Sequence, residues 1–243
     1  MIRFNKTLLL LKSNKLKAIL MSIVVCLLFF VNMNNIIVLA EENTNIHINK
    51  GNELLKKGDL NNAVIEYRKA THLDPNSFEA HMKFGEVLEI KNDYQGAKKE
   101  YEKAISINPE SAEAHECMGF ALLILRDYDG AVKECKEAIR LKPDWVHVYL
   151  LLGDVLESRS LTVPPFKTDE AILYYREAIR LEPDNARAHL QLGTALFGER
   201  DLKGAHEELN ILKKLDKSKA KWLEDMLYPT NEDEQAPSEI IIE

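Results

Sequence analysis

Apolar residues recur along most of the chain at the spacing of an amphipathic helix. A clear example stands at positions i, i+3, i+4 and i+7 of one segment: His81, Phe84, Gly85 and Leu88. Asn92 and Asp93 interrupt this pattern, and a second apolar face follows at positions 97, 101, 104 and 105. Pro109 disfavours helical geometry in the residue before it, so the second helix is expected to end at Asn108.

This helix pair recurs five times. Each copy has a glycine in its first helix, at a spacing of 34 residues except for a final spacing of 40: Gly51, Gly85, Gly119, Gly153 and Gly193. Each second helix has an alanine, and four copies add a second alanine and a closing proline: Ala63, Ala97, Ala131, Ala171 and Ala205; Ala70, Ala104, Ala138 and Ala178; Pro75, Pro109, Pro143 and Pro183. Five copies of one unit predict a solenoid, in which each unit buries its apolar face on its neighbours. Glycine inside a helix costs about 1 kcal/mol relative to alanine, so its recurrence indicates that two helix backbones approach closely there.

These residues and spacings resemble those of the tetratricopeptide repeat (TPR) family over residues 44–219. The resemblance implies an all-α fold, a right-handed superhelical α-solenoid of five helix pairs that forms one elongated domain. The pairs are expected at 44–77, 78–111, 112–145, 146–185 and 186–219. The fifth copy is the weakest, because Leu212 replaces the second alanine and Lys217 stands where proline is expected.

A capping helix is predicted at residues 218–228. Four apolar residues are expected to cover the exposed end of the stack: Trp222, Leu223, Met226 and Leu227. Residues 229–243 then read as a disordered acidic tail, because residues 230–243 contain five acids and no basic residue.

The first 40 residues have the layout of a secretory signal peptide. Five basic residues precede an apolar run over residues 18–31, and Val38-Leu39-Ala40 offers small residues for cleavage before Glu41. This run is short for a transmembrane helix of about 20 residues. The alternative is an uncleaved membrane anchor, and both interpretations place the repeats outside the cytoplasm, periplasmic or secreted.

Charge and motifs exclude several classes of function. The whole chain has 32 basic and 39 acidic residues, and loss of the signal leaves a net charge of −12. Such a balance argues against binding to nucleic acid or, through charge, to anionic lipid. Four histidines stand four residues before the repeat glycines and are interpreted as half-buried packing residues: His47, His81, His115 and His189. With no catalytic, metal-binding or phosphate-binding motif in the sequence, we expect no enzyme, no metal and no cofactor.

The two cysteines beyond the signal lie in the third copy. Cys135 is expected in the buried stripe, whereas Cys117 should face away from the core, so a disulfide between them is geometrically poor.

The resemblance implies that a protein or peptide lies along the groove formed by the first helices. Helical angles place on this groove the positions six and three before the repeat glycine, and one, four and five after it. In the three middle copies these positions contain seven acids and no lysine or arginine. The candidate binding residues are Glu79, Met82, Glu86, Glu113, Glu116, Phe120, Leu123, Leu150, Asp154 and Glu157. An acidic groove with an apolar patch predicts a basic or amphipathic partner, and the alternative is the solvated face of an acidic protein.

The fourth copy contains six extra residues between its glycine and its alanine, which the segment Leu161–Phe166 with its two prolines best explains. This segment is either a tolerated loop insertion or a protruding contact loop.

Three functions fit the whole pattern. The leading one is a non-enzymatic interaction scaffold outside the cytoplasm. The others are a dedicated chaperone or receptor for an exported peptide, and a non-catalytic subunit of an envelope enzyme.

Overall fold

The computed structural model describes residues 43–162 and 169–229, together with isolated residues between positions 21 and 29. The predicted N-terminal signal or anchor, apart from those isolated positions, lies outside the described residues. So do residues 163–168, which include part of the predicted insertion Leu161–Phe166, and the tail from residue 230. In the part that is described, no helix has the length and apolar character needed to cross a membrane.

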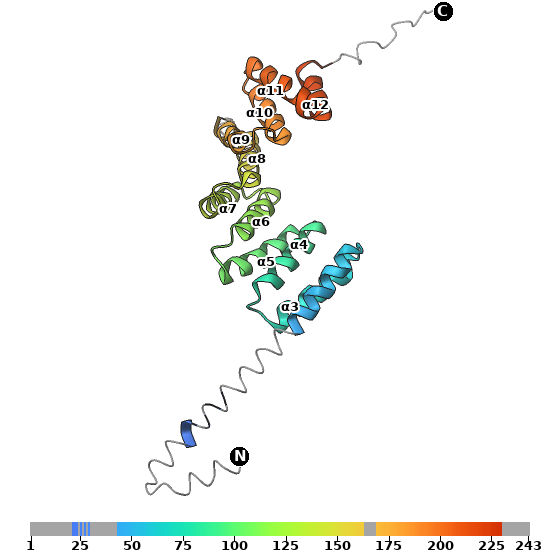
Figure 1. The fold of residues 1–243 in the computed structure, drawn as a ribbon, viewed down its shortest axis with the longest axis vertical. Coiled ribbons are helices and arrows are strands. Elements are labelled where there is room, and N and C mark those ends of the chain that lie inside the picture. The colour runs from blue at the N-terminus through green and yellow to red at the C-terminus, as the bar shows by residue number, and fades with distance from the viewer. Residues whose placement is uncertain are drawn as a thin grey trace, which may run out of the picture. The chain divides into compact units, whose positions relative to one another are not determined.

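Every described element of regular structure is a helix, which confirms the all-α prediction (Figure 1). Residues 43–56 form the first helix of the repeats. The others are α3 (Leu60–Leu73), α4 (Phe78–Ile90), α5 (Tyr94–Ile107), α6 (Ala112–Ile124), α7 (Tyr128–Leu141), α8 (Val146–Thr162), α9 (Asp169–Leu181), α10 (Ala186–Gly198), α11 (Leu202–Leu215) and α12 (Lys217–Leu227).

The chain divides into two compact units, Met1–Val87 and Leu88–Glu243, rather than the single domain expected from the sequence. The division falls inside α4. A solenoid has no common core, because each repeat contacts only its neighbours.

In the first unit, the helix at residues 43–56 pairs with α3. A Cβ atom on Gly51 would lie 2.6 Å from the Tyr67 ring of α3, so only glycine allows this contact. The side chain of Arg68 lies over the ring of Phe84, 5.9 Å from its centroid.

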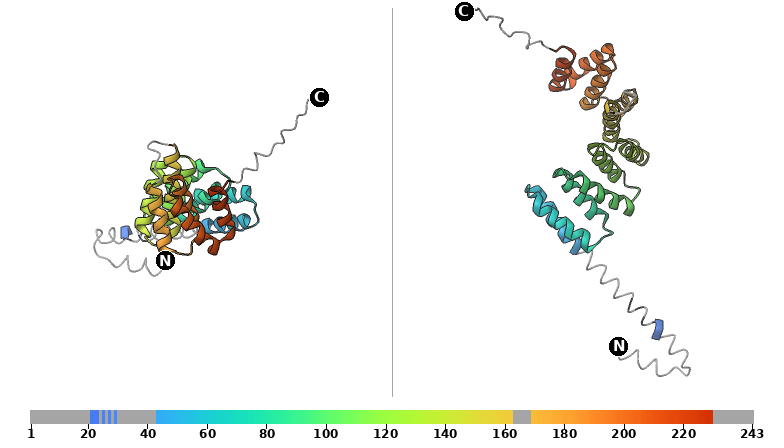
Figure 2. Two further views of the ribbon diagram at one scale, coloured as in Figure 1. Left: turned by 90° about the horizontal axis from the view of Figure 1, so that it is seen from above. Right: turned by 180° about the vertical axis from the view of Figure 1, so that it is seen from behind.

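The second unit consists of consecutive helix hairpins. α6 packs on α7, α8 on α9 and α10 on α11, while α7 also packs on α8 and α9 on α10 (Figures 1 and 2). Each hairpin therefore has a first helix and a second helix, and α6, α8 and α10 are successive first helices.

Local sequence explains where the second helices begin and end. Asp93, Asp127 and Asp201 are N-caps, whose carboxylates accept a hydrogen bond from the backbone three residues later. α5 ends at Ile107, and Asn108 leaves helical geometry before Pro109, as the sequence predicts.

Three of the four repeat histidines, His81, His115 and His189, are more buried than expected, whereas His47 is half-buried as the sequence predicts. His115 is only 6% exposed because both ring nitrogens have partners: Nδ1 lies 2.6 Å from Glu134 and Nε2 lies 3.0 Å from the Pro109 carbonyl. His189 has equivalent contacts, and in the fourth repeat the Tyr149 hydroxyl donates to the Pro143 carbonyl instead. His115 and His189 therefore join their first helix to its own second helix and to the turn before it.

Helix α12 closes the C-terminal end of the second unit. Leu223 is fully buried against Leu209 and Leu212, with Met226 and Leu227 partly buried beside them. The prediction for Trp222 is wrong, because this side chain is 52% exposed. Leu223 and Trp222 are adjacent in the helix and therefore point about 100° apart, so only one of them faces the stack.

Candidate functional site

Helical angles place the residues one and four after each repeat glycine on the expected groove side of the first helix, and we call them the groove pair of that repeat. In the fourth repeat the groove pair is Asp154 and Glu157. The Tyr175 ring crosses from α9 beneath Gly153, and its hydroxyl reaches both carboxylates at 2.9 Å. In the first repeat the Tyr67 hydroxyl donates to Asn52 in the same way, at 2.7 Å. A tyrosine in the second helix therefore bonds at least one polar groove residue in each of these repeats, although the other groove residue of the first repeat, Leu55, is apolar.

Two repeats lack this tyrosine and have a different groove pair. In the third repeat Cys135 takes its place, with Sγ 2.8 Å from where a Cβ atom on Gly119 would lie. Cys135 is fully buried, which raises the pKa of its thiol to about 12. Cysteine has no phenol hydroxyl that could bond a groove residue from this position, and the pair is the apolar Phe120 and Leu123.

The fifth repeat follows the same rule. Leu209 stands at the tyrosine position, and the groove pair is Thr194 and Phe197. Along α6, α8 and α10 the groove pairs of the second unit are therefore apolar, acidic and mixed, since Thr194 is polar and Phe197 is apolar.

The acidic side chains of this groove have partners on neighbouring first helices. Glu116 of α6 lies 2.7 Å from His147 of α8, and this hydrogen bond raises the pKa of His147. Asp154 accepts a bond from Arg187 of α10 at 2.9 Å and one from Gln191 at 2.7 Å. These bonds connect α6 to α8 and α8 to α10, and they neutralise part of the expected acidity.

Glu157 differs from Asp154 in its electrostatics. Burial raises the pKa of its carboxyl, although the bond from Tyr175 opposes the change. The Tyr175 hydroxyl has one proton and faces two carboxylates, so it donates to only one of them at a time. Asp154 already has two other donors, whereas within the described residues Tyr175 is the one donor found at the Glu157 carboxylate.

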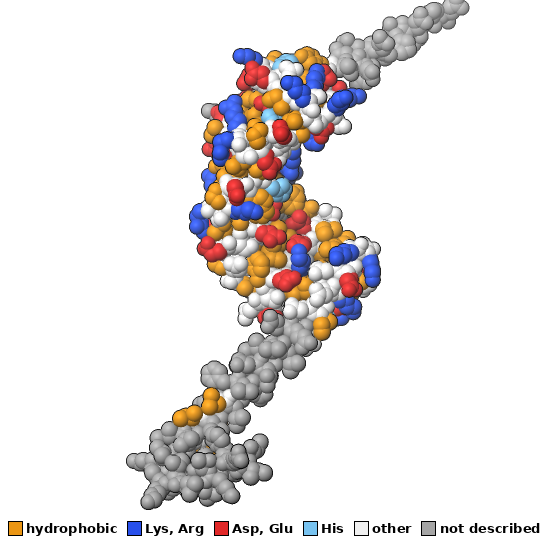
Figure 3. Space-filling view, in the orientation of Figure 1, with side chains coloured by type: hydrophobic (Ala, Val, Ile, Leu, Met, Phe, Trp, Pro, Cys, Tyr) orange, Lys and Arg blue, Asp and Glu red, His pale blue; other side chains and the backbone are white. Residues whose placement is uncertain are grey.

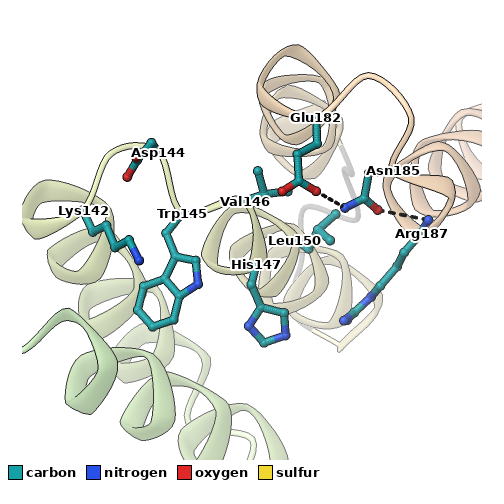
Figure 4. A pocket seen from close by; sticks show the side chains of 9 residues that line it. All are labelled: Lys142, Asp144, Trp145, Val146, His147, Leu150, Glu182, Asn185 and Arg187. Carbon is teal, nitrogen blue, oxygen red and sulfur yellow. Dashed lines mark hydrogen bonds between the residues drawn. The ribbon is translucent and has the colours of Figure 1, made fainter.

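A pocket of about 440 Å³ opens beside this groove, where α8 and α10 begin (Figure 4). Val146 and Leu150 supply its apolar surface, and the other lining residues are Lys142, Asp144, Trp145, His147, Glu182, Asn185 and Arg187. The Lys142 ammonium lies over the Trp145 ring, 4.7 Å from its centroid. Because both signs of charge line this pocket, it extends the groove without adding to its acidity.

The structure groups only part of the predicted site. Glu113, Glu116, Phe120, Leu123, Leu150, Asp154 and Glu157 belong to the second unit, whereas Glu79, Met82 and Glu86 belong to the first. Glu86 forms an ion pair with Lys83, and Glu79 and Glu113 are exposed.

Met82 and Leu150 are wrong as freely accessible groove residues, since their side chains are 3% and 2% exposed. Both stand three residues before the glycine, and the other apolar residue predicted at this position in the first unit, Ile48, is equally buried at 2%. An apolar residue at this position is therefore buried in the first, second and fourth repeats, whereas Leu190 of the fifth is half-buried. Phe120 and Leu123 are half-buried, and Phe120 contacts the Tyr94 ring edge-on at 6.3 Å.

Sequence reasoning missed Tyr175, Gln191 and the Trp145 side of the pocket. The signal for Tyr175 was present, because Tyr67, Tyr101 and Tyr175 occupy one repeat position that Cys135 and Leu209 replace. The visible face in Figure 3 shows acidic, basic and apolar side chains interspersed rather than one continuous acidic surface.

Comparison with known proteins agrees with this architecture. The family described as TPR repeat matches residues 51–89, 90–125 and 167–198, and the one described as tetratricopeptide repeat matches residues 112–145. No curated protein matches the chain.

Solved structures show the same fold. A crystal structure of MamA is 26% identical, with a TM-score of 0.64 over 70% of this chain and 96% of MamA. YrrB, described as a TPR protein with an unusual peptide-binding site, is 23% identical, with a TM-score of 0.59 over 74% of this chain and 90% of YrrB. PilF from Pseudomonas aeruginosa is 23% identical, with a TM-score of 0.60 over 78% of this chain and 94% of PilF.

The repeat glycines, the stacked helix hairpins and the matched repeats agree with one another, and the chain belongs to the tetratricopeptide repeat family.

Proposed function

We propose that this protein is a non-enzymatic interaction scaffold that binds a segment of a partner protein along α6, α8 and α10. TPR proteins generally bind proteins or peptides, and the peptide-binding site described for YrrB supports this reading of a related fold. The observation that carries the proposal is the apolar groove pair Phe120 and Leu123, which stays half-exposed beside hydrogen-bonded acids.

Hydrogen bonds between helices hold polar side chains of the groove in place before a partner binds. Asp154 has donors from α9 and from α10, and Glu116 joins α6 to α8. Side chains that are already held in place lose little conformational entropy on binding, which favours affinity. An amphipathic segment fits this surface, because apolar side chains can contact Phe120 while polar ones meet Glu157.

We further propose that the scaffold acts outside the cytoplasm. The basic start of the chain, the apolar run and Val38-Leu39-Ala40 support export, either by a cleaved signal or with a retained anchor.

Site-specific photo-crosslinking tests the proposed binding face. A photoreactive phenylalanine analogue replaces Phe120 in one variant and Leu173 in the control, in the cells that make the protein. Leu173 lies on α9, a second helix, and is 62% exposed, so it reports contacts away from the groove. We expect a discrete crosslinked product from position 120 and none of the same mass from position 173. Identical products from both positions, or none from position 120, would contradict the proposal.

A further inference from the structure

We propose that the partner segment lies in an extended conformation across the first helices and is recognised by a three-point pattern. An apolar side chain contacts Phe120 and Leu123, a basic side chain about three residues on meets Glu157, and a second apolar side chain about three residues further contacts Phe197. This inference rests on the proposed function and adds the chemistry of the partner.

The spacing follows from the order of the helices. Glu116 reaches His147 directly, and Asp154 reaches Arg187, so α6, α8 and α10 are immediate neighbours on this face. Packed helices lie about 8–10 Å apart, and an extended chain advances about 3.3 Å per residue. One helix therefore corresponds to about three residues of an extended partner. A helical partner, which rises about 1.5 Å per residue, needs about six.

The middle position favours a cation because of the state of Glu157. Its Oε2 atom contacts Tyr175, and no hydrogen bond to Oε1 is found within the described residues. Asp154 is already bonded to Arg187 and Gln191, so Glu157 is the acid with capacity for another donor. Burial disfavours the ionised form of this carboxylate. A lysine or arginine of the partner places a positive charge beside it, so binding of the partner favours the ionised form.

The outer positions favour apolar side chains because of residues behind the groove. Cys135 and Leu209 replace the tyrosine in the third and fifth repeats, so no phenol hydroxyl holds a polar groove pair there. Phe120 and Phe197 are both half-buried, so part of each side chain remains accessible. Burial of apolar surface against such aromatic side chains is the usual source of binding energy in a protein interface.

The probe for this inference is a displayed library of random twelve-residue peptides, flanked on both sides by Gly-Ser linkers. We expect the full-length protein to select peptides with two apolar residues about six positions apart and a lysine or arginine midway. For a selected peptide, Glu157→Gln should weaken binding by about threefold to tenfold, the range of the net contribution of one hydrogen bond. Lys133→Ala, at an exposed position of α7, is the matched control and should leave the affinity unchanged.

Two variants test whether these residues determine which peptides are selected. Glu157→Lys should make the protein select aspartate or glutamate at the middle position. The double variant Cys135→Tyr, Phe120→Asn gives the third repeat the Tyr67–Asn52 arrangement of the first, and should select a polar residue in place of the first apolar one. Circular dichroism checks that both variants fold. If the double variant does not fold, Phe120→Asn alone is tested in its place.

The outcomes separate this inference from the proposed function. Selected peptides whose apolar residues recur at helical spacing, or whose middle residue is indifferent to Glu157→Lys, would overturn the three-point pattern while peptide binding stands. Failure to select any peptide above a column without protein would overturn both.

Discussion

The contact between Gly119 and Cys135 predicts that the effect of Gly119→Ala on the free energy of unfolding changes sign with the residue at position 135. A Cβ atom on Gly119 would lie 2.8 Å from Cys135 Sγ, whereas the next atoms, the Ala131 carbonyl oxygen and the Cys135 nitrogen, are 3.6 Å away. Only the sulfur atom therefore obstructs an alanine at this position.

The magnitude follows from two opposing effects. Alanine is favoured over glycine inside a helix by about 1 kcal/mol. Overpacking of a tight core contact costs about 1–3 kcal/mol. We therefore expect Gly119→Ala to lower the free energy of unfolding by about 1 kcal/mol in the natural sequence, and to raise it by about 1 kcal/mol when Cys135→Ala has removed the sulfur. Gly119→Leu should cost about 1–3 kcal/mol in the natural sequence.

Urea unfolding followed by circular dichroism, on the four proteins of this cycle, measures the coupling between the two sites. Gly198→Ala is the control, since a Cβ atom there meets nothing within 4 Å and the variant should gain about 0.5–1 kcal/mol. The same sign for Gly119→Ala in both backgrounds would refute the packing argument.

Three further predictions concern other parts of the chain. Arg126 has a positive φ of 61° at the turn where the first repeat has Gly58, so Arg126→Gly should stabilise the fold by about 0.5–1 kcal/mol and Gly58→Ala should destabilise it by about as much, both measured by urea unfolding. The hydrogen bond to Glu116 raises the pKa of His147, so the pair's stabilising effect is complete below the ordinary histidine pKa of about 6.5 and is lost as the pH rises through the raised value. An NMR titration should show that Glu116→Gln lowers the pKa of His147, and an unchanged pKa would contradict the assignment. N-terminal sequencing of protein from its native host should find a mature chain that begins at Glu41, and a cytosolic chain beginning at Met1 would exclude export.

Periodicity was sufficient to predict the helix pairs, because the same residue types recur at the same positions of successive repeats. The glycine, the two alanines and the proline all report contacts within one hairpin or at its end, and helical angles convert them directly into packing faces. The prediction that helix backbones approach at the glycines needs refinement, since Gly51 and Gly119 face the Tyr67 ring and the Cys135 sulfur of the paired helix.

The groove was harder to predict because its character depends on contacts between repeats. Helical angles placed Met82 and Leu150 on the groove, but they do not report how closely the next repeat packs. Charge counting treated Asp154 as a free acid, although Arg187 neutralises it from the following first helix. The support of Asp154 and Glu157 by Tyr175 joins residues that stand 21 and 18 positions apart, where the insertion breaks the repeat spacing.

The central claim is that the groove pair of the third repeat binds the partner, and the affinity of a crosslinked or selected partner for two double variants tests it most directly. Phe120→Ala with Leu123→Ala removes the apolar groove pair, whereas Leu173→Ala with Ile211→Ala removes two exposed apolar side chains from the second helices α9 and α11. With folding verified by circular dichroism, we expect the first variant to bind about tenfold more weakly or worse, and the second to bind like the natural protein. Equal affinity of the two variants would contradict the claim.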